Sequence, residues 1–66
     1  MVISDFTKPE LDYLRENCNF VNLEIDLFER RSQGDTLETI ADDLNISIDY
    51  ARKLSQKVNK KIIKVL

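Results

Sequence analysis

Apolar side chains recur three or four residues apart in four separate stretches of the chain, at residues 8–17, 23–31, 37–44 and 48–64. This spacing places them along one face of an α-helix. The strict alternation of apolar and polar residues that is typical of a strand does not occur. The chain has one Gly and one Pro, so few positions interrupt helices. The pattern predicts a single all-α domain, residues 1–66, with four helices joined by short connections.

Capping chemistry marks the start of the first helix. Thr7 and Glu10 have the spacing of a capping box, and Pro9 falls in the first turn, where a missing N–H costs little. The six residues before them carry no capping or periodic signal. We expect residues 1–6 to form an N-terminal arm with two apolar side chains that can pack back on the helices, Ile3 and Phe6.

The second helix has less regular signals. Asn19 or Asn22 is expected to cap it. Its apolar residues cover a broad arc, as in a helix that packs on two sides: Leu23, Ile25, Leu27 and Phe28. Arg30 and Arg31 mark the end of this helix, because cations are favourable at its negative C-terminal end. Gly34 follows, at a position where the backbone often adopts the left-handed conformation.

Residues 36–58 have the organisation of two helices joined by a tight turn. Thr36 and Ser47 stand where N-caps are needed, and Asn45 suits a turn residue with positive φ. Five apolar residues of this stretch are placed to fill the wedge between two helices that cross steeply: Ile40, Leu44, Ile46, Ala51 and Leu54. We therefore expect a helix-turn-helix formed by helices three and four.

The stretch from Gly34 to Ile62, GDTLETIADDLNISIDYARKLSQKVNKKI, resembles the helix-turn-helix domains of sigma-factor region 4 and of LuxR-type regulators. The upstream FTKPELDYL is similar to the opening helix of such four-helix domains. Asn45 stands where Gly is frequent in these families, and Tyr50-Ala51 replaces a common Thr-Val pair. The resemblance implies DNA binding, with the helix from residue 47 onward in the major groove. It does not imply promoter recognition by polymerase or control by phosphorylation.

Composition narrows the chemistry that is available. The chain has no His and one Cys, Cys18, which excludes a His-based triad, a conventional zinc site and an internal disulfide. One Gly is too few for a phosphate-cradling loop, and no apolar run approaches the roughly 20 residues that span a bilayer. We expect a cytoplasmic protein that is not an enzyme, with no cofactor, metal, membrane partner or small-molecule substrate.

Charge is distributed unevenly although the net charge is only −2. Residues 1–49 hold four cations and all twelve carboxylates, a formal charge of −8, whereas residues 50–66 hold six cations and no carboxylate, +6. At about 100° per residue, four lysines lie within roughly 60° of one another on the last helix: Lys53, Lys57, Lys60 and Lys64. Such a flank is typical of phosphate binding, although lysines are also the ordinary solvent-facing residues of an amphipathic helix.

Six residues in the first turns of the last helix are expected to meet base edges: Ile48, Asp49, Tyr50, Arg52, Lys53 and Gln56. Arg52 suits guanine and Gln56 suits adenine. Tyr50 either touches a thymine methyl or a phosphate or packs on the third helix. Asp49 either accepts from cytosine N4 or only stabilises the positive end of the helix. Expected phosphate contacts are Thr36, Ser47, Lys53, Lys57 and Lys60.

The apolar C-terminal residues predict a second copy of the chain as a partner. One recognition helix reads few base pairs, and four residues are candidates for a homodimer interface: Ile62, Ile63, Val65 and Leu66. The alternative is that this tail folds back onto Phe6 or the first helix.

A different function is also open at this stage. The same fold can serve as a protein-interaction module that docks on RNA polymerase, a sigma factor or another regulator. Its working face would then be the acidic surface around Glu24, Asp26 and Glu29.

Overall fold

The computed structural model describes residues 3–66, which form one short 3-10 helix and four α-helices and contain no β-strand. The elements are η1 (Ile3–Asp5), α1 (Lys8–Asn17), α2 (Leu23–Ser32), α3 (Leu37–Leu44) and α4 (Ile48–Val65). The prediction of an all-α fold with four helices is confirmed, and the helix bounds agree closely with the expected ones. The first two residues of the predicted arm lie outside the described residues.

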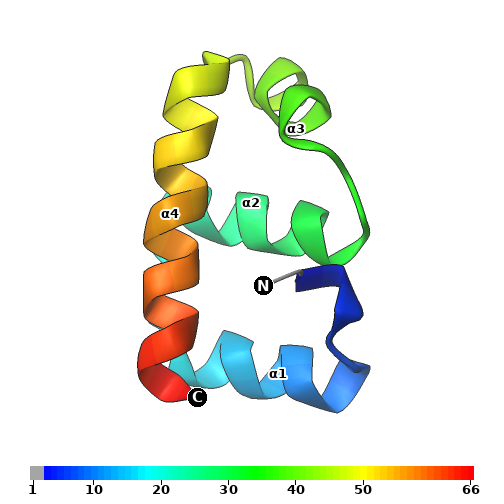
Figure 1. Cartoon of the computed structure of the whole chain (residues 1–66), viewed down its shortest axis with the longest axis vertical. Coiled ribbons are helices and arrows are strands. Elements are labelled where there is room, and N and C mark those ends of the chain that lie inside the picture. Colours follow the sequence, from blue (N-terminus) through cyan, green and yellow to red (C-terminus); the bar gives the residue numbers. More distant parts are fainter. Residues whose placement is uncertain (1–2) are drawn as a thin grey trace.

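Helix α4 is the longest element, and the other three α-helices are arranged along it (Figure 1). At about 1.5 Å per residue its 18 residues extend about 27 Å. Helix α3 contacts its first turns, α2 contacts its middle and α1 contacts its last turns (Figure 1). The short helix η1 packs against α2. One helix therefore holds the other elements together.

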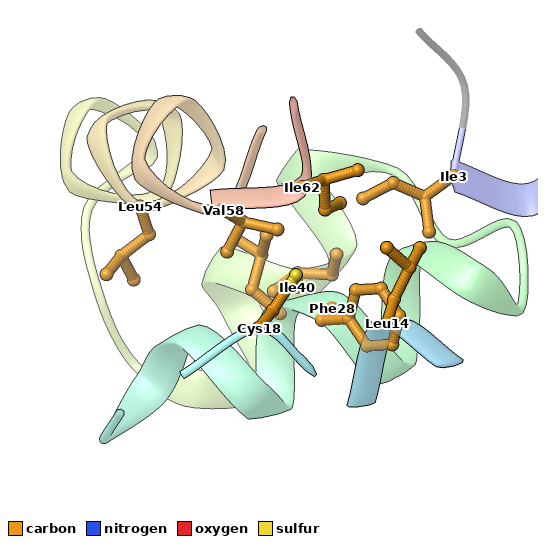
Figure 2. Packing of buried hydrophobic residues seen from close by; sticks show 9 residues of the cluster. Ile3, Leu14, Cys18, Phe28, Ile40, Leu54, Val58 and Ile62 are labelled. Atoms are coloured by element: carbon orange, nitrogen blue, oxygen red, sulfur yellow. The ribbon is translucent and has the colours of Figure 1, made fainter. Parts of the chain in front are cut away.

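The core lies between α4 and the elements stacked along it (Figure 2). Ile3 of η1 is buried beside Leu14 and Phe28, and Phe6 packs against the same core while partly exposed. Ile3 and Phe6 of the arm therefore both pack back on the helices as expected. Phe20 packs on Phe28, with ring centroids 4.8 Å apart. The buried apolar residues of the cluster are Ile3, Leu14, Cys18, Leu27, Phe28, Ile40, Leu54, Val58 and Ile62. Cys18 is a small residue of this core.

Helix α1 begins with the predicted capping chemistry. The Glu10 carboxylate accepts hydrogen bonds from the Thr7 amide (2.7 Å) and the Thr7 hydroxyl (3.0 Å). Pro9 lies in the first turn, where no intrahelical partner for an N–H exists.

Helix α2 differs from the prediction in two respects. Asn22 precedes the helix, but its side chain makes no capping hydrogen bond; the Glu24 carboxylate accepts from the Val21 amide (3.1 Å) instead. Ile25 is 45% exposed, whereas Leu27 and Phe28 are fully buried. Ile25 is about 200° from Leu27 around the helix axis, on a side of α2 that is exposed to solvent in the described part of the chain. The helix therefore packs over a narrower arc than we expected.

The end of α2 follows its sequence signals. Gly34 has φ +92°, a backbone conformation that a residue with a Cβ rarely adopts. The Arg31 guanidinium donates to the Asp35 carbonyl oxygen (2.9 Å), which fixes the connection to α3.

Candidate nucleic-acid interface

The connection between α3 and α4 is a turn of three residues, Asn45–Ser47. Asn45 adopts the left-handed conformation, with φ 57° and ψ 46°, which lets the Ile46 amide donate to the Ala41 carbonyl oxygen (2.9 Å). The Ser47 hydroxyl then accepts from the Tyr50 amide (3.1 Å) and starts α4. The predicted turn chemistry is confirmed at each of these positions.

Small and branched apolar residues hold α3 against α4. Ala41 and Ala51 are both buried, and their small side chains permit close approach of the two helices. Ile40 and Leu54 are buried in the core cluster, and Leu44 and Ile46 pack against that cluster while partly exposed. The first turns of α4 therefore have a fixed orientation relative to α3.

One flank of α4 is open and positively charged. Its four lysines, hereafter the lysine stripe, are all exposed: Lys53, Lys57, Lys60 and Lys64. Among residues 3–66 none of them forms an ion pair. At about 1.5 Å per residue the stripe extends about 16 Å along the helix. Its charge is therefore available to a ligand.

Lys61 does not belong to the lysine stripe. Its ammonium donates to the Glu24 carboxylate (2.5 Å) and to the Asn19 carbonyl oxygen (2.6 Å). Glu24 is only 5% exposed. Burial by itself raises the pKa of Glu24, but the hydrogen bonds from Lys61 and from the Val21 amide outweigh it, so the pKa lies below its ordinary value. Lys57 also contributes to this lowering through its charge.

The residues expected to meet base edges lie together on the first turns of α4. Ile48 is half-buried, and the other five, Asp49, Tyr50, Arg52, Lys53 and Gln56, are exposed. Arg52 and Asp49 form an ion pair at 3.4 Å in which both side chains are well exposed, so it competes only weakly with an external ligand. Tyr50 is about half exposed, and its ring is accessible from solvent.

Thr36 and Ser47, expected to contact phosphate, are exposed at the N-termini of α3 and α4. The Thr36 hydroxyl accepts from the Thr39 amide (3.2 Å), as the Ser47 hydroxyl does from Tyr50. A hydroxyl that accepts from an amide still carries a proton that it can donate. Capping and phosphate contact are therefore compatible for Ser47.

The predicted dimer interface needs a correction. Ile62 is fully buried in the core of the single chain, and Val65 packs against that core. Ile63 and Leu66 are 64% and 74% exposed. Ile62 lies about 180° from the centre of the lysine stripe, so it belongs to the core face of α4 and cannot form an intermolecular surface.

The predicted acidic face is also smaller than we expected. Glu24 is buried with Lys61, and the Glu29 carboxylate pairs with Arg15. Arg30 pairs with Asp43 (2.6 Å), which joins α2 to α3 and occupies that guanidinium. Of the three carboxylates assigned to this face, only that of Asp26 is exposed without an ion pair within the described part of the chain.

Other kinds of site find little support in residues 3–66. They contain no group of three or more His, Cys, Asp or Glu side chains that could hold a metal ion. The Cys18 thiol is buried, and burial raises its pKa, with Lys61 opposing in part. No helix in this range is long and apolar enough to cross a bilayer.

Comparison with known proteins does not identify the chain. No family model, no curated protein and no solved structure matches it. Function has to be inferred from the residues of this chain.

Proposed function

We propose that this protein is a sequence-specific, double-stranded DNA-binding regulator of transcription. Helix α3, the turn Asn45–Ser47 and α4 would act as a helix-turn-helix, with α4 in the major groove. The first turns of α4 would face base edges, and the lysine stripe would face the sugar-phosphate backbone.

The lysine stripe is the observation that carries this proposal. Duplex DNA carries a condensed layer of counterions, and lysines that neutralise its phosphates release those counterions, which favours binding. Among residues 3–66 the four lysines on this flank of α4 form no ion pair, so their charge is free to neutralise phosphates. A solvated flank of ordinary lysines would be equally exposed. The lysine stripe differs from such an ordinary flank in its position. It lies on the helix whose first turn is fixed by the Ser47 cap and by the buried residues between α3 and α4, and a helix that docks in a groove needs such a fixed orientation.

Position along α4 suggests a role for each polar side chain. Arg52 and Gln56 are two side chains with planar groups that can make bidentate contacts with guanine and adenine. Lys53 and Lys57 lie beside them and suit the nearest phosphates, and Lys60 follows one turn later. The major groove is about 12 Å wide, so Lys64 would reach the same duplex least well.

The acidic remainder of the chain is compatible with this proposal. Repulsion between exposed charges is largely screened beyond a Debye length, about 8 Å at physiological salt. Five carboxylates are engaged in ion pairs with cations of the same chain: Asp12, Glu24, Glu29, Asp43 and Asp49. The remaining acids would orient the molecule during its approach to DNA.

Salt dependence tests the phosphate contacts. Duplex binding, measured by fluorescence anisotropy over a range of salt concentrations, should weaken steeply as salt rises. Lys57→Gln should reduce the slope of log K against log salt by about 1. Lys8→Gln is the matched control, because Lys8 is an exposed lysine of α1 outside the stripe, and it should leave the slope unchanged. Equal effects of the two variants would contradict the proposal.

Selection from a random duplex pool tests sequence recognition. The wild-type chain should enrich one motif, and Arg52→Ala should relax the preference at one position, at a cost of about 1–3 kcal/mol there. A uniform loss of affinity across all sequences would instead mean that Arg52 contacts only phosphate.

The same measurements separate DNA binding from the alternative. If the chain binds no duplex at low salt, the protein-interaction module that docks on polymerase or another regulator is favoured. Its working face would then have to lie elsewhere than Glu24 and Glu29, because both are engaged within the chain.

A further inference from the structure

An open pocket of about 320 Å³ lies between α1 and the end of α4. These two elements meet at the end of the molecule away from α3 (Figure 1). The pocket is lined by Phe6, Pro9, Glu10, Tyr13, Leu14 and Leu66. Glu10 is the only charged residue among them, and its carboxylate is engaged at the start of α1. The interior of the pocket is therefore mainly apolar.

The rim of this pocket carries a protruding apolar side chain. The Tyr13 hydroxyl donates to the Val65 carbonyl oxygen (3.3 Å), which holds the end of α4 over α1. Leu66 follows directly and is 74% exposed, and Tyr13 is half exposed. The apolar pocket and the exposed apolar side chain of Leu66 therefore lie next to each other on the same surface.

We infer that this surface binds a second copy of the same chain, with Leu66 of each copy seated in the pocket of the other. A two-fold interface uses the same patch on both subunits, so the patch must complement itself. A pocket on α1 beside a projection from α4 meets this condition. A partner of another kind would need only one of the two features.

Charge supports the same arrangement. Reciprocal insertion places the end of α4 of each copy over α1 of the other. The end of α4 brings Lys60 and Lys64, and α1 brings Glu16, an exposed carboxylate. Within residues 3–66 none of these three side chains has an ion-pair partner. Reciprocal insertion would therefore bring opposite charges of the two copies to the edge of the apolar centre.

This inference does not rest on the proposed DNA binding, although Lys60 and Lys64 belong both to the lysine stripe and to the edge of this interface. The interface lies at the last turn of α4, whereas Arg52 and Gln56 lie near its first turns and stay exposed in the dimer. The chain exposes 4450 Å², and a standard interface of about 800 Å² per partner would take nearly a fifth of it. We therefore expect a small interface and a dimer that dissociates on dilution.

Sedimentation equilibrium over a range of concentrations tests the dimer without any DNA. Leu66→Ser should weaken self-association at least tenfold. Ile63→Ser is the matched control, since Ile63 is almost as exposed but does not line the pocket, and it should change the dissociation constant less than twofold. Circular dichroism should show that both variants remain folded, because both side chains are largely exposed.

Two further measurements test the geometry. In a mixture of isotope-labelled and unlabelled chains, filtered NMR spectra should show contacts between the Leu66 methyl groups of one copy and the Tyr13 ring of the other. Glu16→Lys and Lys64→Glu should each weaken the dimer, and the double variant should restore part of the affinity. The inference fails if the chain stays monomeric up to about 1 mM, well above the usual range for specific complexes. It also fails if Ile63→Ser is as disruptive as Leu66→Ser, or if no contact between copies appears.

Discussion

The ammonium of Lys61 and the carboxylate of Glu24 lie 2.5 Å apart across the contact between α4 and α2. The same ammonium donates to the Asn19 carbonyl oxygen, and the same carboxylate accepts from the Val21 amide. Glu24 is the one buried charged side chain in the described range. This pair therefore joins both ends of the α1–α2 connection to the last helix.

The two partners of this pair should contribute unequally to stability. Lys61→Met leaves a buried carboxylate without its cation, so we expect it to lower the free energy of unfolding by about 2–3 kcal/mol. Glu24→Gln should cost only about 1 kcal/mol, because the amide oxygen can still accept from Val21 and Lys61 can turn toward solvent. Urea denaturation measures both values.

Lys60→Met is the control for this comparison, since Lys60 is exposed and unpaired within residues 3–66. It should change the free energy of unfolding by no more than about 0.5 kcal/mol. A larger loss from Glu24→Gln than from Lys61→Met would show that the carboxylate is not the group that burial penalises.

The pair should also make stability depend on pH. The pKa of Glu24 in the folded chain lies below its ordinary value of 4.5. Its contribution is therefore complete above pH 4.5 and is lost as the pH falls through the lower, folded pKa. The stability difference between wild type and Glu24→Gln, taken from urea midpoints, should shrink on acidification. A difference that stays constant below that pH would exclude the carboxylate charge as its source.

The Cys18 thiol should react slowly in the folded chain. It is buried, its sulfur lies 3.6 Å from the Lys61 carbonyl oxygen, and burial raises its pKa above 9.0. Both lack of access and a smaller thiolate fraction slow alkylation. We expect iodoacetamide to label the native chain at least tenfold more slowly than the urea-unfolded chain. Labelling at equal rates would contradict the burial of Cys18.

Asn45 is the left-handed residue of the α3–α4 turn, and replacing it by Gly or by Ala should affect stability differently. Asn45 has φ 57°, a conformation that Ala adopts at a cost of about 1 kcal/mol and Gly adopts freely. Asn45→Ala should therefore lower the melting temperature, and Asn45→Gly should keep or raise it. If both variants lowered it equally, the loss would come from the Asn side chain and not from the backbone.

Local structure was predictable from the sequence because its causes are local. Thr36 and Ser47 accept from amides three residues ahead, and Asn45 tolerates a positive φ, whatever the rest of the chain does. Helical spacing also placed Ile40 and Leu54 between helices three and four, and both are buried. The caps, the turn residue and the helical spacing were therefore enough to predict the all-α fold class and to choose α4 as the candidate interface.

Long-range side-chain partners could not be predicted in the same way. Lys60 and Lys61 are adjacent and chemically identical, yet only Lys61 meets a carboxylate, because α2 lies on its side of α4. For the same reason Ile62 is core and Ile63 is exposed, although the sequence grouped both as interface residues. The neighbouring helix decides such cases, and a single sequence does not state where it lies.

The arrangement of α4, with core residues on one side and the lysine stripe on the other, limits how its length can change. One residue inserted between Val58 and Lys60 would rotate every later position by about 100°. Ile62 would leave the core, and the lysines beyond the insertion would move out of line with Lys53 and Lys57. The register of this helix is therefore fixed over its whole length, and related chains should vary in length in their loops and not within α4.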